Sequence, residues 1–379
     1  MITRIKVRNF KSLGDFEITD LAPFTCLIGL NGSGKTTLLQ FLDFVHALLQ
    51  GRIKEWFEQY KWDVSDIITF GSAKRIVEFE IDVTDSGNTQ TWFARFNIQE
   101  MRCTQESLVM KRQDNTTEDI AFYTENKLKL YGNDYPLPPN FKQQGSIFSI
   151  LHPLPATPAA ILASKTFGVL DPSSIAQSTQ TKAGHKNVEV KSDGYGLVGF
   201  ISQLPELQQR QLFVQLHEFY PAVKNHKIRK QHFGWKNLLL NEIENAYFDA
   251  SHLSYGTLRL LVILSQYYSE NGCLIFDEIE NGINQELVEK LLALLQDFNG
   301  KQVLVTTHSA LVLNYLSDDA ARDSVVLLFK DADGHTHAMK FFEHPDIAPK
   351  MEFMAPGQIM SQTNLIELSR KLALPGEEK

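Results

Sequence analysis

The stretch LIGLNGSGKTTLLQFL, residues 27–42, constrains the fold of this chain more than any other part of its sequence. Gly29, Gly34, Lys35 and Thr36 fit the pattern G-x-x-x-x-G-K-[ST]. The apolar run FTCLIG leads into the loop, and apolar residues at helical spacing follow it. The stretch therefore predicts a strand, a tight loop and a helix in direct succession.

A loop of this kind binds phosphate groups. Glycines let backbone N–H groups turn inward around phosphate oxygens, and the N-terminus of the following helix adds partial positive charge. We expect Lys35 to reach the β and γ phosphates, and Thr36 to hold Mg²⁺. The residues expected to contact the nucleotide are Asn31, Gly32, Ser33, Gly34, Lys35, Thr36 and Thr37. The expected cofactors are ATP and Mg²⁺.

Length and composition allow one to three folded domains, because 379 residues with 43% hydrophobic side chains can build a sizeable core. The net charge of −8 argues against a globally basic nucleic-acid binder, although a local basic patch could still bind phosphate. Cys26, Cys103 and Cys273 show no C-x-x-C spacing, and no apolar run approaches the roughly 18 residues of a membrane span. We expect a protein of the reducing cytoplasm.

Strand signals dominate the first third of the chain. Residues 75–83 and 91–98 alternate apolar and polar side chains, and the pattern continues to about residue 132, which predicts an antiparallel β-layer. Residues 133–190 concentrate proline, serine and threonine, so we expect irregular structure with short helices and a mobile segment near 176–187. A helical pair should follow, and then a strand pair within 224–242.

Two later stretches each place polar residues after a short apolar strand. In GCLIFDEIENG, Asp277 could hold Mg²⁺ through its water shell, and Glu278 could take a proton from an attacking water; the alternative is a plain acidic turn. In KQVLVTTHSA, His308 could contact the γ phosphate or that water, although such a histidine is often structural. One helix separates the two strands, as a parallel β-α-β unit requires.

A third stretch, LSYGTLRLLVILSQYY (residues 253–268), predicts a Ser-x-Gly-Thr turn that opens a buried helix. The helix N-terminus could bind an anion, with Ser254 and Gly256 at its start. Alternatively, Ser254 only caps the helix, although a cap alone requires neither Gly256 nor this place in the order of motifs.

Together these motifs resemble the ABC-type ATPase heads of the SMC and RecF-like families, and more closely the stand-alone, predicted AAA-family ATPases of prokaryotes, several of which serve anti-phage defence. The resemblance covers about half the chain. It implies an α/β, P-loop NTPase fold of the ABC-ATPase head type, with a mixed central sheet, an antiparallel β-layer and a helical or irregular insertion. The implied domains are an N-terminal lobe (1–132), the insertion (133–222), a C-terminal lobe (223–345) and a terminal helix and tail (346–379).

The resemblance also implies roles for particular residues. VRNFKSL matches the opening strand, which puts Asn9, Phe10, Lys11 and Ser12 near the base or ribose, with Lys11 as a nucleotide-binding residue. Glu278 and His308 become catalytic, Thr36 and Asp277 become metal ligands, and Ser254 with Gly256 forms the signature. Where relatives often read DEPENGLHP, this chain has Ile279, Asn284 and Gln285 in place of proline, histidine and proline. Because of that departure, the resemblance does not fix the details of the contact between subunits.

No effector domain is evident between or after the motifs. The interval from Thr36 to Ser254 holds no long heptad run, and Asp331 and Asp333 read as part of a β-hairpin with an Asp-Gly turn instead of a nuclease site. His335, His337 and His344 lack the further ligand that a metal site needs. The segment TNLIELSRKLA predicts a short amphipathic helix.

The sequence leaves two functions open. In the first, the chain forms a homodimer or higher homo-oligomer around ATP and switches a separate effector, a nuclease or toxin, in anti-phage defence. In the second, a RecF-like dimer clamps DNA through the basic stretch 224–236, which carries Lys227, Arg229 and Lys230 among aromatic residues. Such a charged strand face can also be merely solvated.

Overall fold

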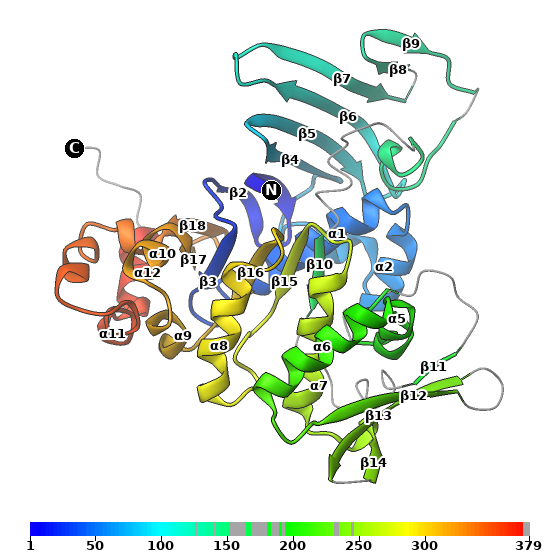
Figure 1. The fold of residues 1–379 in the computed structure, drawn as a ribbon. Coiled ribbons are helices and arrows are strands. Elements are labelled where there is room, and N and C mark those ends of the chain that lie inside the picture. Colours follow the sequence, from blue (N-terminus) through cyan, green and yellow to red (C-terminus); the bar gives the residue numbers. More distant parts are fainter. Residues whose placement is uncertain are drawn as a thin grey trace. The chain divides into compact units, whose positions relative to one another are not determined.

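The computed structural model describes residues 1–125, 127–138, 141–151, 164–167, 180–182, 189–191, 194–230, 235–243 and 246–373 (Figure 1). The chain forms two compact units. The first comprises Met1–Lys165, Asn271–Ile275 and Gly300–Lys379, and the second comprises Thr166–Glu270 and Phe276–Asn299. Within the described residues, no helix combines the length and the apolar character that crossing a membrane requires.

An antiparallel sheet of eight strands forms much of the first unit, in the order β2-β1-β4-β5-β6-β7-β8-β9. Its strands are β1 (Ile2–Phe10), β2 (Leu13–Ile18), β4 (Ile76–Asp85), β5 (Asn88–Asn97), β6 (Arg102–Lys111), β7 (Thr117–Thr124), β8 (Lys127–Leu130) and β9 (Asn133–Tyr135). The two-residue turn between β4 and β5 holds Ser86 and Gly87 at φ 48° and 79°. Positive φ at both residues suits the twist of a hairpin. The predicted β-layer is confirmed.

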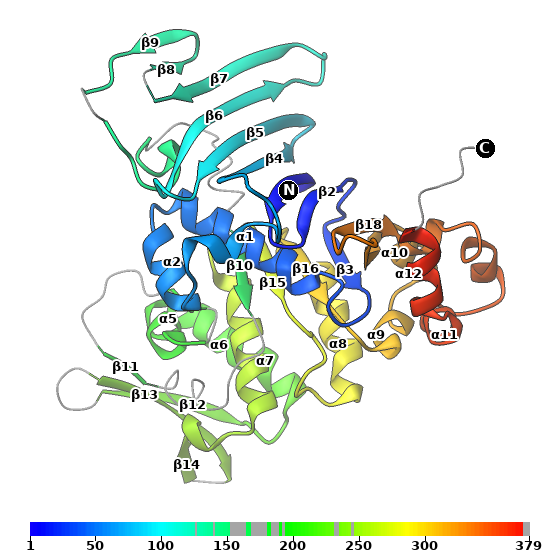
Figure 2. The same ribbon diagram turned by 180° about the vertical axis from the view of Figure 1, so that it is seen from behind.

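The apolar face of this sheet packs against α1 (Lys35–Leu49), as both ribbon views show (Figure 1, Figure 2). Phe44 of α1 lies at the centre of an aromatic cluster, with its ring 5.5 Å from Phe10 and 5.1 Å from Phe96. The Trp56 ring from α2 (Ile53–Tyr60) lies 5.5 Å from that of Phe44 on another side. The helix that follows the glycine-rich loop is therefore fixed by a rigid, interlocked core.

One carboxylate is buried in this layer. Glu106 on β6 accepts hydrogen bonds from Ser146 Oγ (2.5 Å), the Ile147 backbone N–H (2.7 Å) and Trp92 Nε1 (3.3 Å). Burial raises the pKa of Glu106 to about 7, while these hydrogen bonds act in the opposite direction. Through these bonds Glu106 holds Ser146 and the start of the short 3₁₀ turn Ile147–Ser149 against the sheet. The Ser146 backbone N–H also donates to Leu48 O, which ties the same segment to α1.

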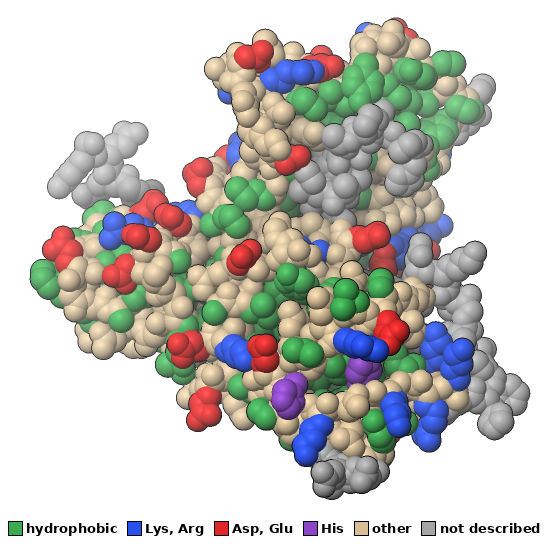
Figure 3. All heavy atoms as spheres, viewed as in Figure 1, with side chains coloured by type: hydrophobic (Ala, Val, Ile, Leu, Met, Phe, Trp, Pro, Cys, Tyr) green, Lys and Arg blue, Asp and Glu red, His purple; other side chains and the backbone are tan. Residues whose placement is uncertain are grey.

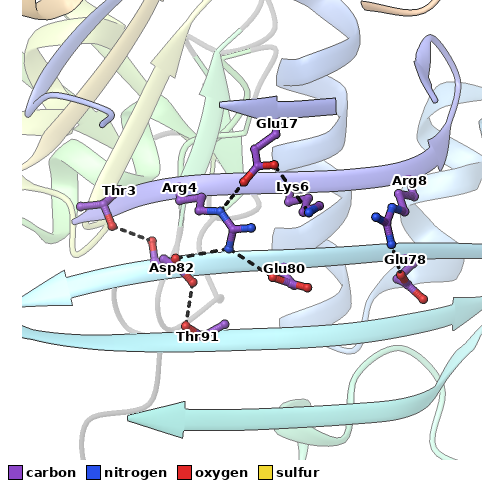
Figure 4. Close-up of polar contacts among 9 residues, drawn as sticks. All are labelled: Thr3, Arg4, Lys6, Arg8, Glu17, Glu78, Glu80, Asp82 and Thr91. Atoms are coloured by element: carbon purple, nitrogen blue, oxygen red, sulfur yellow. Dashed lines mark hydrogen bonds and ion pairs between the residues drawn. The ribbon is translucent and has the colours of Figure 1, made fainter. Parts of the chain in front are cut away.

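The opposite face of β1, β2 and β4 carries charges in matched positions (Figure 4). The register places Lys6 opposite Glu17 on one side and Glu80 on the other. Arg4 Nε lies 2.6 Å from Glu17 and its Nη1 lies 3.1 Å from Glu80. Arg8 is paired in the same way, with Asp15 at 3.0 Å and Glu78 at 3.1 Å. The cations of β1 are therefore neutralised by their neighbours.

A mixed sheet of six strands carries the glycine-rich loop, in the order β10-β15-β16-β3-β17-β18. Its strands are β3 (Phe24–Ile28), β10 (Ser164–Phe167), β15 (Cys273–Phe276), β16 (Gln302–Thr306), β17 (Val325–Lys330) and β18 (Thr336–Lys340). Both β16 and β17 run parallel to β3, and β18 returns antiparallel to β17. This is the α/β P-loop fold that the motifs predict.

The predicted hairpin at the end of this sheet is confirmed. Its turn closes with the Asp331 N–H donating to His335 O, and Gly334 takes φ 82°. Asp331 lies 2.8 Å from His337 Nε2, so this carboxylate belongs to the hairpin itself. The remaining helices of the unit are α9 (Ala310–Asn314), α10 (Asp318–Ser324), α11 (Pro356–Gln362) and α12 (Leu365–Ala373), the last of which confirms the predicted terminal helix.

The second unit combines helices with a small sheet. The predicted helical pair is α5 (Leu197–Gln203) and α6 (Glu206–Phe219), and the further helices are α7 (Tyr255–Ser265) and α8 (Gln285–Gln296). The predicted strand pair is β12 (Asn225–Lys230) and β13 (Trp235–Ile243), joined by β11 (Gln180–Lys182) and β14 (Ala246–Asp249). Of the segment expected to be mobile, 176–179 and 183–187 lie outside the described residues.

Candidate functional site

The glycine-rich loop occupies the turn between β3 and α1. Gly29, Gly32 and Gly34 take φ of 145°, 79° and 108°, conformations that other residues rarely adopt. A Cβ at position 29 would collide with the Leu328 carbonyl oxygen, and one at position 34 with Thr336 Oγ1. The loop can therefore keep this path only with glycine at these points.

Lys35 lies inside the loop. Its ammonium group donates to Gly29 O at 2.8 Å and to Leu30 O at 3.2 Å, and the residue is only 5% exposed. Asn31, Gly32 and Thr36 are exposed. A buried cation beneath an open loop tip, at the N-terminus of α1, is an arrangement suited to an anionic group with several oxygens.

Two residues outside the motif support the loop. Thr336 Oγ1 donates to Ser33 O at 3.0 Å and lies 2.8 Å from Ser12 Oγ. The Thr336 N–H donates to Ser12 O. Thr336 could not be selected from the sequence, because only the tertiary fold brings β18 against the loop.

Lys11 borders a cavity of about 700 Å³ together with Ser12, Asp66, Arg75 and His335. Its ammonium donates to Gln40 Oε1 at 3.0 Å and lies 3.6 Å from the centre of the Trp62 ring. Burial lowers the pKa of Lys11. The expected contact of Lys11 and Ser12 with the base or ribose stays a prediction.

The two residues before Lys11 have other surroundings. Phe10 is fully buried against α1, and the Asn9 amide donates to the backbone oxygens of Lys74 and Ile76. The Phe10 side chain therefore belongs to the core, whereas Asn9 lines a neighbouring cavity of about 920 Å³ that also borders Arg75 and His335.

His308 lies at the same sheet edge as the loop. It follows β16, which pairs with β3 so that Thr306 stands beside Leu27. The Thr307 N–H donates to Leu27 O at 3.2 Å, and His308 itself is exposed. Within the first unit, His308 therefore follows the strand beside the one that leads into the loop.

The terminal helix α12 also borders the loop. A cavity of about 580 Å³ has Asn31 and Gly32 on one side and Ile366 and Arg370 of α12 on another. The amphipathic helix is therefore used within its own unit, at the tip of the loop.

The second unit holds the signature and the acidic pair. Ser254 is the N-cap of α7, and its Oγ accepts a hydrogen bond from the Thr257 N–H at 3.2 Å. Residues Gly256–Ser265 are all buried, which confirms the predicted core helix. A Cβ at position 256 would collide with the Gly282 carbonyl oxygen, so Gly256 lets α7 approach the turn that follows the acidic pair.

Asp277 and Glu278 directly follow β15. Glu278 takes φ 47°, in the left-handed region. The amide of Asn281 donates to Glu278 Oε2 at 3.1 Å, and the Asn281 N–H donates to Glu278 O. Arg259 of α7, which the sequence analysis did not select, donates to the backbone oxygens of both acidic residues. An arginine inside an otherwise apolar helix was the signal available.

These groups match the chemistry of a magnesium nucleotide. The loop offers backbone N–H groups and the Lys35 ammonium for phosphate, while the Thr36 hydroxyl and the Asp277 carboxylate are oxygen ligands of the kind that Mg²⁺ prefers. Among the described residues, no cluster of His, Cys, Asp and Glu forms a separate metal site.

Comparisons with known proteins agree with this chemistry. Residues 1–135 match a family model described as "AAA ATPase domain". Residues 194–314 match one described as "AAA domain, putative AbiEii toxin, Type IV TA system". A segment of 45 residues is 44% identical to the OLD nuclease of Thermus scotoductus; it makes up 12% of this chain and 8% of that nuclease.

The fold is similar to solved SMC heads. An SMC head bound to the C-winged helix domain of ScpA aligns with a TM-score of 0.51 and 16% identity, over 90% of this chain and 99% of that chain. The SMC head domain from Thermotoga maritima aligns at 0.46 and 15%, over 89% and 98%. Two separate segments of the chain thus match AAA ATPase family models, and the fold is similar to that of an SMC head.

Proposed function

We propose that this protein is a Mg²⁺-dependent ATP hydrolase whose two copies close around ATP and thereby switch a separate effector. The observation that carries the proposal is the glycine-rich loop, with its buried Lys35 ammonium held by Gly29 O and Leu30 O. Phosphate oxygens can replace these two carbonyl acceptors without rebuilding the loop.

Each motif residue then has a task. Lys35 holds the β and γ phosphates, and Thr36 with Asp277 holds the metal ion, which offsets phosphate charge during transfer. Glu278 takes a proton from the attacking water, and His308 contacts the γ phosphate or that water. Lys11 and Ser12 border the nucleoside.

The signature serves the nucleotide of the other subunit in this proposal. Ser254 and Gly256 begin a helix of 11 residues whose N-terminal N–H groups favour a phosphate. In related heads this helix N-terminus faces away from its own loop, so each site is complete only in a dimer.

The effector is a nuclease or toxin acting in anti-phage defence. Two comparisons support this part. The description of one matched family names a putative toxin of a type IV toxin–antitoxin system, and the 45-residue segment is similar to part of a nuclease. The similar SMC head is itself bound to a second protein. A pull-down from the native host that recovers neither a nuclease nor a toxin would contradict this assignment.

Hydrolysis is tested with Lys35→Ala and Glu278→Gln. Lys35→Ala should lose ATP binding, because no other ammonium can replace it in the loop. Glu278→Gln should bind ATP as the wild type does, turn over about 10²-fold more slowly, and accumulate as a closed dimer. Calorimetric ATP titration and phosphate release measure the two effects. Unchanged ATP affinity in Lys35→Ala would refute the loop assignment.

The composite site is tested by mixing two inactive proteins. Lys35→Ala and Ser254→Arg should each be inactive, yet a mixture should recover up to one working site per heterodimer, because one interface receives both intact halves. Heterodimers are followed with two affinity tags. Failure to recover activity although heterodimers form would leave Ser254 as a helix cap only.

A DNA clamp remains a second candidate function. The observation that favours it is the β12 surface, where Arg229 and Lys230 are exposed and their side chains make no ion pair or hydrogen bond with any described residue. Figure 3 shows Lys and Arg side chains gathered over β11, β12 and β13. Polyanions bind to such unpaired cations.

A further inference from the structure

The proposed roles do not explain why the Arg259 side chain is buried. It lies on α7, one turn after the signature, and is 2% exposed. No carboxylate of a described residue forms an ion pair with it, and its Nε has no hydrogen-bond partner among the residues that the structure describes. Burying a guanidinium without a counter-ion is costly, so its position calls for a reason.

The guanidinium points at the backbone of the acidic pair. Its Nη2 donates to Asp277 O at 2.7 Å and to Glu278 O at 2.9 Å, and its Nη1 donates to the Tyr255 hydroxyl at 3.2 Å. Hydrogen bonds from a charged donor are stronger than neutral ones. The two carbonyl groups belong to the peptides before and after the Glu278 Cα, and the directions of these peptides set where the Glu278 side chain points.

The backbone at Glu278 needs such support. A φ of 47° is unfavourable for a residue with a Cβ, and it persists only where surrounding contacts impose it. Arg259 supplies two of these contacts, and Asn281 supplies another at the carboxylate.

The same contacts tie α7 to the acidic turn. The Tyr255 ring covers Gly282, where a Cβ would collide with it, and Gly256 meets the Gly282 carbonyl oxygen just as closely. The start of the signature helix and the turn 277–282 therefore pack as one block, with Arg259 bonded to both.

We propose that Arg259 is a positioning residue, which holds Glu278 in its left-handed conformation and couples it rigidly to the signature helix. This inference rests on the proposed hydrolase function. Arg259 touches neither nucleotide nor water in this role; it acts through Glu278. Phosphate binding at Lys35 should not depend on it.

The test compares Arg259→Met and Arg259→Lys with the wild type. Arg259→Met should lower kcat by about 10–100-fold, because small misplacements of a reacting group have effects of that size, while the Kd for ATP stays within about twofold. Arg259→Lys should lose less, since an ammonium can still donate to both carbonyls. Arg210→Met on α6, whose arginine is exposed and paired with Glu206, is the control and should change neither quantity.

A double mutant separates positioning from a merely structural role. If Arg259 acts through Glu278, adding Arg259→Met to Glu278→Gln should cause no further loss in single-turnover hydrolysis, because the group it positions has already been removed. A multiplicative loss, or a tenfold weaker Kd for ATP, would overturn the proposal.

Two further outcomes are informative. If Arg259→Met does not fold, Arg259→Gln decides, because a shorter, neutral amide cannot reproduce both charged hydrogen bonds; wild-type kcat in that variant together with a lowered melting temperature contradicts positioning. If Glu278→Gln alone hydrolyses ATP normally, Glu278 is not the base and the present inference fails with it; if the wild type hydrolyses no ATP, the proposed function fails. If Glu278→Gln is slow and Arg259→Met is normal, only the present inference fails.

Discussion

The outer faces of two antiparallel sheets differ in whether their cations have acidic partners. On β1, each of Arg4, Lys6 and Arg8 contacts at least one carboxylate of a neighbouring strand. On β12, Lys227 lies 4.1 Å from the centre of the Tyr247 ring, and the described residues offer no acidic partner to Arg229 or Lys230. The two strands alternate in a similar way in sequence, so the difference arises from the strands beside them.

The neighbours differ in composition. β1 runs between strands that present Asp15 and Glu17 on one side and Glu78, Glu80 and Asp82 on the other. β12 faces β13, which sets Leu239 opposite Lys227 and Asn237 opposite Arg229. A charged strand thus indicates a binding surface only when its cross-strand partners leave the charge uncompensated.

Not every residue of the basic stretch belongs to that surface. His226 stacks on Phe213 with ring centres 3.7 Å apart, and burial lowers the pKa of His226 to about 4, so it carries no charge at neutral pH. Lys236 donates to Ser202 Oγ. His232 and Phe233 lie outside the described residues.

The largest expected effect concerns nucleic-acid affinity. If β12 binds a polyanion, Lys227→Glu/Arg229→Glu/Lys230→Glu should weaken binding by about 10²–10³-fold at low salt, and by less at high salt, because each phosphate contact releases counterions. ATP hydrolysis should survive. Fluorescence anisotropy with single-stranded and duplex DNA, with ATP present, measures this.

Arg8→Glu is the matched control, since Arg8 lies on the face where carboxylates already neutralise the cations; its affinity for DNA should stay within about twofold. If both proteins lose affinity equally, the contrast between the two faces has no functional meaning. No DNA binding by the wild type at low salt removes the clamp hypothesis.

A second prediction concerns the buried charge of the first sheet. The pKa of Glu106 in the fold is about 7 against 4.5 in the unfolded chain, so its contribution to stability is complete below pH 4.5 and is lost as the pH rises to about 7. The lost amount is on the order of 3 kcal/mol.

Urea unfolding at pH 5 and pH 8 tests this with Glu106→Gln, which cannot ionise. The stability of the wild type minus that of Glu106→Gln should be smaller at pH 8 than at pH 5. Cys103 is buried beside Glu106, so Cys103→Ser is the control. This variant keeps Glu106, and the stability of the wild type minus that of Cys103→Ser should therefore be the same at pH 5 and pH 8. A difference that stays constant with pH would mean that Glu106 does not titrate in this range.

The smallest expected effect tests the ion pairs themselves. Arg4→Ala should lower the free energy of unfolding by about 0.5–1 kcal/mol in low salt and by less in 1 M salt, because exposed pairs are weak and screened. Arg229→Ala, an arginine without a partner among the described residues, should stay within about 0.5 kcal/mol. Equal losses in the two variants would show that pairing contributes nothing measurable on β1.

Local signals explain how much of the fold could be predicted. The phosphate loop, the strands near 75–98 and the hairpin at 325–340 each depend on a few adjacent residues, and the structure has them where the sequence predicts them. Glu106 could have been noticed, because it occupies an inward position in the alternation of β6.

Residues that depend on distant contacts could not be predicted. Thr336 meets Ser33 across 303 positions of the chain. Arg259 reaches the acidic turn only because Gly256 and Gly282 allow α7 to come close. The lack of an acidic partner for Arg229 and Lys230 among the described residues has the same cause, since the identity of a neighbouring strand is a property of the fold and not of the segment.

With Glu278 in its proposed role as the base, its left-handed conformation sets activity against stability. At φ 47° a glycine would relieve backbone strain of roughly 1–3 kcal/mol, so the backbone there favours a residue that cannot take a proton. Selection for thermal stability alone would replace Glu278. A carboxylate kept in so unfavourable a conformation is expected where selection favours the reaction even at some loss of stability.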